Sequence, residues 1–514
     1  MNRWIALAND MSKITKSSIY KRRYPLAIIT ISLLLIIILL ITGLYAPNGL
    51  AQTEINSAVA SHKLGFANLF EAHNIVNLPY KILQKLSINI FGLSIFSIKL
   101  PSLLIAAITA VSLFILIAAW TDRRSAILAT VIILISSRWL FLSQLGDHQV
   151  ATIGLSITLT SALALLTQQS NAIYQAKKRP KYYQIALVAL LLTIFVSAGL
   201  LFYFPMGVYL IFIISLTMLL HPFVRLSLKR LNKLVGNTWY FVGLTCLAVS
   251  VTPLAIGLIK DGDVATNLFN LDSFNFNLFE NLKFLLKEFL DFSPQQNSLF
   301  ATPWFNLSAV VLIVIGVFRE IRTSYKPRSS IIIMWLFAAI VINLFSQQTT
   351  ILTFVPCALS LAMGLDYILI SWYRIFPRNP VARFAGLVPI VILLTSLVLY
   401  NLDAYVNAYH YQPGLANQFN TDLRLLQRQL KEHKDEPVKI IASHRFNEAE
   451  FYQILAAQNQ NIIVANEYDS QSSDQQIATR LARDPLNDYD INHIITSHFT
   501  QNADRFYVYK KPQK

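Results

Sequence analysis

The chain has little charge and almost no cysteine. Of its 514 residues 14% are charged and 54% are hydrophobic, whereas soluble globular domains carry roughly 25% charged residues. Both cysteines, Cys246 and Cys357, lie inside apolar runs, which excludes a disulfide framework and favours a role in helix packing. This scarcity of charge excludes an ordinary soluble enzyme and indicates an integral membrane protein.

Apolar runs of membrane-spanning length repeat along the chain as far as residue 401 and then stop. A helix needs about 20 apolar residues to cross a bilayer. The first run follows Lys21-Arg22-Arg23 and is longer than the apolar core of a secretory signal, so it is predicted to be an uncleaved signal anchor. We predict about eleven transmembrane helices, at 25–45, 98–120, 125–143, 149–168, 182–199, 205–220, 238–259, 303–319, 329–345, 350–371 and 382–401.

The basic residues give these spans an orientation. The segments predicted to lie inside, starting with the N-terminus at 1–24, hold 23 Lys and Arg, whereas the two long outer loops, 46–97 and 260–302, hold 6. Because Lys and Arg mark the cytoplasmic side of short loops, we expect a multi-pass protein of the plasma membrane with its N-terminus in the cytoplasm and its C-terminus outside. Dispersed in such loops, the basic residues form no nucleic-acid-binding patch.

The pattern changes in the last part of the chain, 402–514. Predicted strands at 438–441, 461–464, 491–496 and 506–509 alternate with predicted helices at 421–433, 448–458 and 473–482, which indicates a small α/β domain. It carries no phosphate-binding glycine loop and no nucleophile elbow, so an accessory or recognition role is expected. The predicted fold class is mostly α: a membrane domain over 25–401, followed by this non-cytoplasmic domain.

Two acidic residues stand where a site could form. Glu54 follows the first span and Asp147 lies in the tight turn between the third and fourth spans. Ionisable groups at membrane depth are costly and are therefore functional candidates. A carboxylate there could act as a general base or coordinate a divalent cation beside a lipid phosphate. The alternative is that each is a solvated loop acid near the headgroups.

Further polar residues share the predicted outer face. Three lysines could pair with a lipid phosphate, or could simply be interfacial lysines at helix ends: Lys81, Lys85 and Lys260. No zinc-binding spacing links the histidines of this face. Four residues are candidates for binding the acceptor or shaping the site: His73, Asn77, Tyr80 and His148.

Several short stretches resemble the membrane-embedded GT-C glycosyltransferases. They begin with Leu-Pro-Tyr-Lys-Ile-Leu at 78–83 and with 90–102, which ends in Lys-Leu-Pro-Ser. The most similar subgroup comprises the protein O-mannosyltransferases, which use dolichyl-phosphate mannose, and the lipid A aminoarabinose transferases. The resemblance covers about residues 25–400 and continues at 122–126, 199–207 and 354–359.

The resemblance implies a function. It implies a polyprenyl- or dolichyl-phosphate sugar donor, a site on the outer face, and inverting transfer to a protein, lipid or glycan acceptor. Glu54 falls in the family's acidic motif of the first loop and Asp147 matches the acid of the second outer loop. One would be the base and the other a site-shaping acid, in an order that the sequence leaves open. No cofactor is implied other than the divalent cation considered above.

The sequence also departs from the family pattern. Thr53-Glu54 replaces the usual Asp-Glu, Asn77 stands where a basic residue is common, and Thr349-Thr350 replace an Arg-Tyr pair. These departures favour the alternative of a non-catalytic relative with the same fold. A transporter or lipid flippase is a third hypothesis, but such proteins show inverted repeats and charges buried in their spans. Here Asp366 is the one acid well inside a predicted span.

Overall fold

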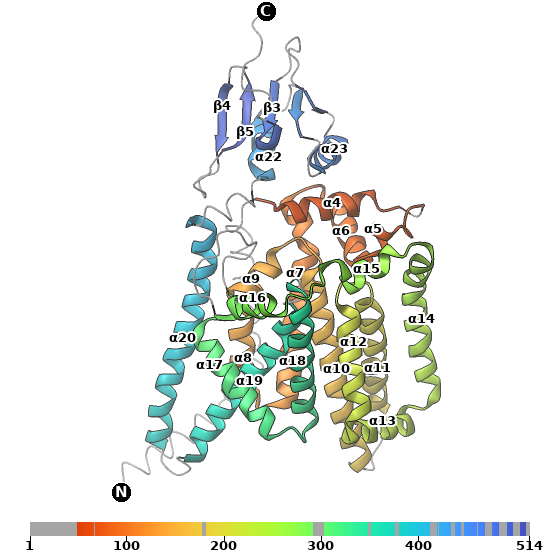
Figure 1. Ribbon diagram of the computed structural model, residues 1–514, viewed down its shortest axis with the longest axis vertical. Helices are drawn as coiled ribbons and strands as arrows, with labels where there is room; N and C mark the ends of the chain where they lie inside the picture. The colour runs from red at the N-terminus through yellow and green to blue at the C-terminus, as the bar shows by residue number, and fades with distance from the viewer. Residues whose placement is uncertain are drawn as a thin grey trace, which may run out of the picture. The chain divides into compact units, whose positions relative to one another are not determined.

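The computed structural model describes most of the chain after the first predicted span (Figure 1). The described residues are 49–65, 67–176, 181–290, 303–347, 351–375, 380–411, 419, 421–432, 437–443, 447–459, 461–467, 475–482, 491–496 and 504–509. The predicted cytoplasmic N-terminus and the span at 25–45 lie outside them, as do Thr349 and Thr350.

Apolar helices dominate the described residues. Six are long and apolar enough to cross a membrane: α7 (Ile95–Trp120), α10 (Gln149–Ala176), α11 (Lys181–Leu201), α14 (Asn237–Lys260), α18 (Pro327–Phe345) and α19 (Ile351–Ile375). Two bent pairs raise the number to eight if each is one span. They are α8 (Arg123–Leu134) with α9 (Ser137–Gln144), bent by 64°, and α12 (Gly207–Leu220) with α13 (Pro222–Val235), bent by 88°.

The two other predicted spans in this part of the chain are also helical. The segment 303–319 matches α17 (Leu307–Arg322), which has 16 residues, and 382–401 matches α20 (Pro380–Tyr411), which has 32. The ambiguous stretch at 199–205 divides as predicted, because α11 ends at Leu201 and Met206 takes a left-handed φ of 67° before α12. A mostly helical, multi-pass membrane protein is confirmed, while the total of eleven spans stays a prediction.

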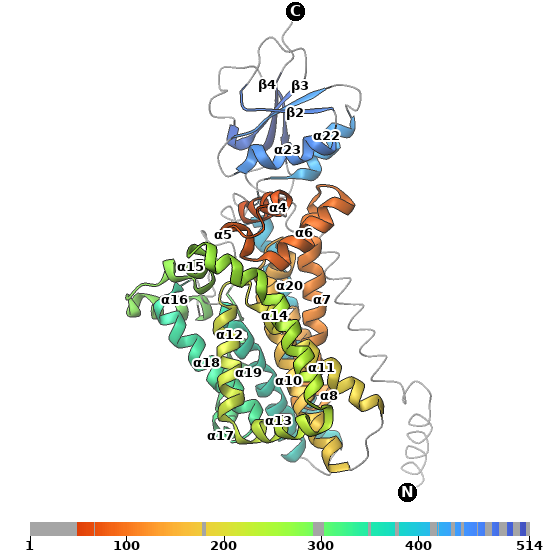
Figure 2. The same ribbon diagram turned by 90° about the vertical axis from the view of Figure 1, so that its right-hand side faces the viewer.

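Short helices gather at one end of the long ones. The first predicted outer loop forms α4 (Gln52–Lys63), α5 (Ala72–Ile75) and α6 (Leu78–Phe91). The second forms α15 (Asp263–Phe269), the 3-10 turn η1 (Leu271–Ser273) and α16 (Leu278–Leu290). In both views α4, α5, α6 and α15 lie at one end of the bundle and α13 at the other (Figures 1 and 2). Exposed apolar side chains on α6 and α16, such as Ile90 and Phe279, suit helices that lie on a membrane surface.

Helices α17 and α19 approach each other unusually closely. A Cβ atom added at Gly316 would lie 1.8 Å from the carbonyl oxygen of Ser360, and one at Gly364 would lie 2.0 Å from that of Leu312. Small residues at such crossings let two backbones meet. One turn further along, Arg319 donates to Asp366 at 2.8 Å across the same contact.

A sheet forms near the C-terminus, as expected for the predicted small α/β domain, but it has five strands where four were predicted. Its strands lie in the order β2-β1-β3-β5-β4; β1 is parallel to β2 and β3, and β5 is antiparallel to β3 and β4. The elements are α22 (Leu423–Glu432), β1 (Val438–Ile441), α23 (Glu448–Gln458), β2 (Ile462–Ala465), β3 (Gln475–Thr479), η4 (Arg480–Ala482), β4 (Ile491–Thr496) and β5 (Asp504–Tyr509).

One prediction for this region was wrong. The segment 473–482 was expected to be a helix, but it holds strand β3 and the short turn η4. All five residues of β3 are buried, because both faces of the strand are covered: Ile477 and Ala478, which point to opposite faces, belong to two separate apolar clusters. A strand covered on both faces lacks the polar–apolar alternation that identifies strands in a sequence.

The sheet packs against the first outer loop. Leu50, Ile55 and Val59 of the loop share one apolar core with Leu426 of α22 and Phe451 of α23. Polar contacts border this core: the Leu50 amide donates to the Thr421 carbonyl at 2.8 Å, and the Leu93 amide to the Gln458 side chain at 2.6 Å. Residues 47–514 accordingly form one compact unit.

The α17–α19 contact yields a first prediction. Gly364→Ala places a methyl group against backbone atoms that cannot give way, so we expect overpacking to cost roughly 1–3 kcal/mol. Thermal unfolding of the detergent-solubilised protein should shift to lower temperature. Gly262→Ala is the matched control, because nothing lies within 4 Å of a Cβ added there. Equal unfolding temperatures for the two variants would contradict the close packing of these helices.

A second prediction concerns Glu448, which accepts hydrogen bonds from the Ser443 amide and the Thr479 hydroxyl. Burial raises the pKa of this carboxyl from 4.5 to about 7, against the opposing effect of those bonds. The folded state therefore binds the proton more tightly than the unfolded state. The protonated Glu448 carboxyl therefore contributes fully to the free energy of unfolding below pH 4.5. This contribution, of up to about 3 kcal/mol, is lost as the pH rises through 7.

Glu448→Gln keeps an acceptor oxygen but cannot ionise. The measurement is the protection of the β3 amides from hydrogen exchange, corrected for the intrinsic exchange rates. At pH 8 this protection in the variant should approach the protection that the wild type shows at pH 5. Burial also raises the pKa of Asp422, but this residue is unchanged in the comparison. The exposed Glu467 provides the control variant Glu467→Gln, which should keep the pH dependence of the wild type.

Candidate active site

The carboxylate of Glu54 is buried and fully engaged. Its Oε2 accepts from the Ala51 amide at 2.8 Å and its Oε1 accepts from the Gly146 amide at 2.7 Å. The Lys99 ammonium lies 3.6 Å from Oε1, and Glu54 itself has no exposed surface. The residue occupies the third position of α4, where an acidic side chain reaches back to the amide before the helix. Glu54 thus ties the start of α4 to α7 and to the turn after α9.

The turn at 145–148 leaves no room for a side chain at Gly146. A Cβ atom there would lie 2.8 Å from Ile98 Cγ2 and 3.2 Å from the Glu54 carboxylate. The fully buried Gln84 of α6 supports the same turn, donating to the carbonyls of Ile98 at 3.1 Å and Gly146 at 3.3 Å. Its own amide oxygen accepts from two hydroxyls of α4, those of Ser57 and Ser61. The backbone beside Asp147 is therefore fixed from three helices.

Asp147 lies next in this turn and forms a pair with His148. Its Oδ1 accepts from the His148 amide at 2.7 Å and lies 2.5 Å from His148 Nδ1. The side chains are 11% and 28% exposed, whereas that of Glu54 is fully covered. Burial alone would raise the pKa of Asp147, but the charge and hydrogen bonds of His148 outweigh it and lower the pKa. Since Nδ1 faces the carboxylate, Nε2 is the nitrogen of His148 that remains available to a ligand.

Tyr80 joins the same group of residues through Ser102. The Tyr80 and Ser102 hydroxyls are 2.7 Å apart, and Ser102 donates to the Asp147 carbonyl at 3.4 Å. Ser102 has one proton to give, so the phenol donates to Ser102. The structure therefore brings four of the predicted site residues together at the ends of α4, α6, α7 and α10: Glu54, Tyr80, Asp147 and His148.

The three candidate lysines have separate surroundings. Lys81 is buried and donates to the Asn74 carbonyl at 3.4 Å, and burial lowers its pKa to about 8. Lys85 donates to the Leu64 carbonyl. Lys260, at the exposed end of α14, lies with its ammonium 5.0 Å from the centre of the Phe70 ring. Two of the three thus donate to backbone carbonyls of the first loop.

The two remaining candidates contribute in different ways. Asn77 takes a left-handed φ of 62° and its amide donates to the Tyr203 carbonyl at 2.9 Å, which links the first loop to the end of α11. Its side-chain oxygen is buried, with no hydrogen-bond partner among the described residues. The side chain of His73 lies outside the described part of the structure.

Sequence reasoning missed Lys99, Gln84 and Gly146. Lys99 stands in the Lys-Leu-Pro-Ser stretch that carries the family resemblance, and Gly146 directly precedes the candidate acid. Either could have been singled out on those grounds. No signal marks Gln84, because a glutamine on an amphipathic helix usually faces water.

The second predicted outer loop is anchored to α9, the helix that precedes the turn at 145–148. Arg138 of α9 lies 3.3 Å from the Glu288 carboxylate of α16, and both side chains are almost fully buried. The guanidinium also stacks 4.5 Å above the ring of Trp304. Because 150 residues separate Arg138 from Glu288, this ion pair could not be predicted from a local sequence pattern.

These residues do not fit a divalent cation. Both Glu54 oxygens accept from backbone amides, and one Asp147 oxygen is taken by His148. Within the described residues no three His, Cys, Asp or Glu side chains are grouped so that they could hold a metal. We therefore derive no step through a metal ion.

Comparisons with known proteins identify the fold. No family model and no curated protein sequence matches the chain. Among solved structures, apo ArnT from Cupriavidus metallidurans matches with a TM-score of 0.50 at 11% identity, over 94% of this chain and 97% of that one. The apo oligosaccharyltransferase of Archaeoglobus fulgidus matches with a TM-score of 0.50 at 13% identity, over 89% of this chain and 66% of the other. This protein has the fold of the GT-C superfamily of membrane glycosyltransferases.

Proposed function

We propose that the protein is a glycosyltransferase that moves a sugar from a polyprenyl-phosphate carrier to a protein, lipid or glycan acceptor on the non-cytoplasmic face of the membrane. The observation that carries the proposal is the Glu54 carboxylate, which binds the Gly146 amide and so fixes the partly exposed Asp147–His148 pair. The GT-C fold and the sequence resemblance agree with it.

The arrangement suits an inverting transfer. The acceptor hydroxyl attacks the anomeric carbon while the bond from that carbon to the carrier phosphate oxygen breaks. The carrier leaves as a phosphate anion, and the hydroxyl proton passes to a base. Asp147 keeps its charge near neutral pH because His148 lowers its pKa. In its neutral form, His148 donates its Nδ1 proton to that carboxylate and offers Nε2 as the proton acceptor.

The lysines would meet the leaving phosphate. Lys81 and Lys85 lie on α6, whose exposed apolar side chains suit a position at the membrane surface. A carrier phosphate lies at the same depth, with its polyprenyl chain in the bilayer. Lysine side chains act on phosphate as point charges, and Lys260 adds a third charge from α14. Asn77 and Tyr80, with His73, would shape the acceptor side.

The orientation follows from the same assignment. Since the sheet packs on α4 and α6, the region 402–514 lies on the side of the membrane that holds the acids. The positive-inside distribution makes that side the outside and leaves residues 1–24 in the cytoplasm. We propose the plasma membrane as the location.

A non-catalytic relative with the same fold is the second candidate. Thr53 replaces the first-loop aspartate of the family, and it is the exposed residue of the pair. Glu54, the acid that remains, is buried and hydrogen bonded. If Asp147 and His148 do not replace the missing acid, the donor would bind without reacting.

The decisive experiment measures sugar release from a panel of polyprenyl-phosphate sugars by the purified full-length protein. Asp147→Asn and His148→Gln should each lower kcat by about 10²–10⁴, with unchanged donor binding. Asp272→Asn is the control, since Asp272 is an exposed acid of the other outer loop. Donor binding without turnover in the wild type would favour the non-catalytic relative. The absence of both donor binding and turnover would overturn the proposal.

Glu54→Gln should behave differently from the Asp147 variant. It removes the charge opposite Lys99 and weakens the hold on Gly146, so both kcat and the unfolding temperature should fall. Breaking a buried ion pair by removing one partner costs about 3–5 kcal/mol. If the variant lost turnover but unfolded at the same temperature as the wild type, Glu54 would instead take part in the chemistry itself.

A further inference from the structure

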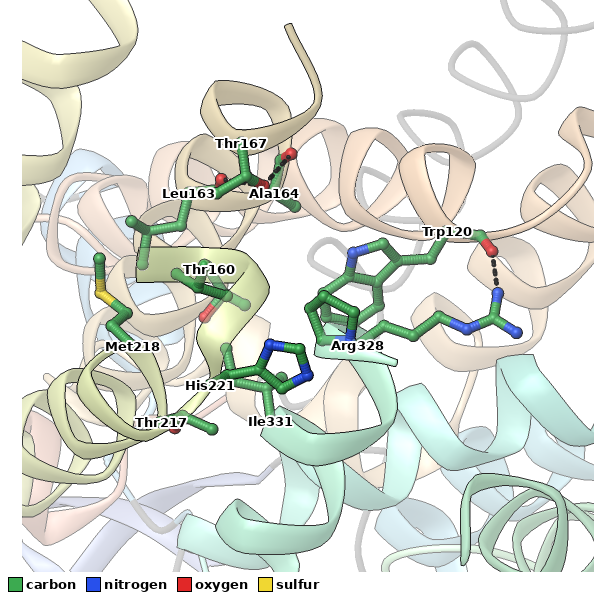
Figure 3. A pocket seen from close by; sticks show the side chains of 12 residues that line it. Trp120, Thr160, Leu163, Ala164, Thr167, Thr217, Met218, His221, Arg328 and Ile331 are labelled. Atoms are coloured by element: carbon green, nitrogen blue, oxygen red, sulfur yellow. Dashed lines mark hydrogen bonds between the residues drawn. The ribbon is translucent and has the colours of Figure 1, made fainter. Parts of the chain in front are cut away.

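A pocket lies at the other end of the bundle, away from the acids. It is enclosed by the end of α7 at Trp120, the middle of α10, the junction of α12 and α13 at His221, and the start of α18 at Arg328 (Figure 3). In Figures 1 and 2 α13 marks this end of the structure. None of the predicted site residues lines it.

Apart from Trp120, His221 and Arg328, the wall of the pocket is largely apolar. It is built from side chains such as Leu163, Met218 and Ile331. Its threonine hydroxyls give their protons to their own helices: Thr160 donates to the Ser156 carbonyl at 2.8 Å and Thr167 to that of Leu163 at 3.0 Å. Such a wall suits methylene groups, with polar recognition left to a few residues.

His221 and Arg328 bring unsatisfied nitrogens to this pocket. His221 Nε2 lies 3.2 Å from the Tyr325 carbonyl, and a carbonyl can only accept, so Nε2 carries a proton. The other ring nitrogen, Nδ1, is buried with no partner in the described part of the chain. Arg328 donates through Nη1 to the Trp120 carbonyl, while its Nε is buried with no partner among the same residues. A buried polar group without a hydrogen-bond partner is destabilising, so a ligand that accepts from it is favoured.

The charge around the pocket is mixed but has a basic excess. Three segments predicted to face the cytoplasm meet here, 120–125, 221–237 and 319–328, and they hold ten Lys and Arg against two Asp and Glu. Asp366 of α19 is paired with Arg319 at 2.8 Å. Glu320 acts electrostatically on Arg328, but it is fully buried and does not line the pocket.

We propose that this pocket binds an anionic phospholipid from the cytoplasmic leaflet. The lipid phosphate accepts from Arg328 Nε and from a protonated His221 Nδ1, which satisfies both nitrogens. The first methylenes of an acyl chain cover the apolar wall. Anionic lipids are concentrated in the cytoplasmic leaflet, and basic pockets between transmembrane helices bind their headgroups. The site is separate from the proposed transferase site and does not depend on its activity.

The test uses delipidated full-length protein in detergent and titrates it with dioleoylphosphatidylglycerol, following bound lipid by native mass spectrometry. Arg328→Gln and His221→Gln should each weaken binding on the order of tenfold, as expected for one charge-assisted hydrogen bond. Arg225→Gln removes an exposed charge from α13, outside the pocket, and should leave binding unchanged. Glu320→Gln should strengthen binding, because it removes the opposing charge.

Two further ligands separate the sources of the phosphate. Dioleoylphosphatidylcholine has the same chains without net charge and should bind more weakly, and inorganic phosphate alone should not compete, because it makes no contact with the apolar wall. Equal binding of the two lipids, or equal losses in the Arg328, His221 and Arg225 variants, would overturn the proposal. Should Arg328→Gln fail to fold, Arg328→Lys and His221→Gln still decide it.

Discussion

The buried carboxylate of Glu54 holds together the end of the bundle that carries the candidate site. Removing a carboxylate from water is costly, and the cost is offset only when the charge is paired and both oxygens are hydrogen bonded. Here Lys99 supplies the opposite charge, and the Ala51 and Gly146 amides supply the hydrogen bonds. These partners come from the loop before α4, from α7 and from the turn after α9. One side chain thus specifies how three separate segments meet.

The same helix is supported from its other face. Ile55 and Val59 of α4 pack against apolar residues of α22 and α23, and Ser57 and Ser61 bind Gln84 of α6. In addition, the Arg138–Glu288 pair fixes α16 to α9, the helix that precedes the turn. The Asp147–His148 pair therefore lies on a rigid backbone, although it belongs to a tight turn. Such preorganisation is what an acid–base group needs, because small displacements are costly to catalysis.

The sequence predicted the features that depend on composition along a short stretch of chain. Every predicted span within the described residues is helical. The chain also breaks near Pro205, as the distribution of Lys and Arg among the loops predicted. Glu54 and Asp147 were singled out because acidic groups are rare in such a chain, and the structure brings them together with Tyr80 and His148. The role of Gln84 could not be found, since its partners Ile98 and Gly146 lie 14 and 62 residues away. The segment that forms strand β3 was predicted to be a helix, because a strand buried on both faces shows no alternation of polar and apolar residues.

The bridge between Leu50 and Thr421 has a consequence for biogenesis. The loop that holds Glu54 leaves the ribosome long before its apolar cover, which comes from residues beyond 420. Throughout translation of the intervening helices, α4 presents Ile55 and Val59 to water or to a chaperone. Contacts so distant in sequence form late and slowly. Maturation of the candidate site must therefore wait until the residues beyond 420 have been translated and folded.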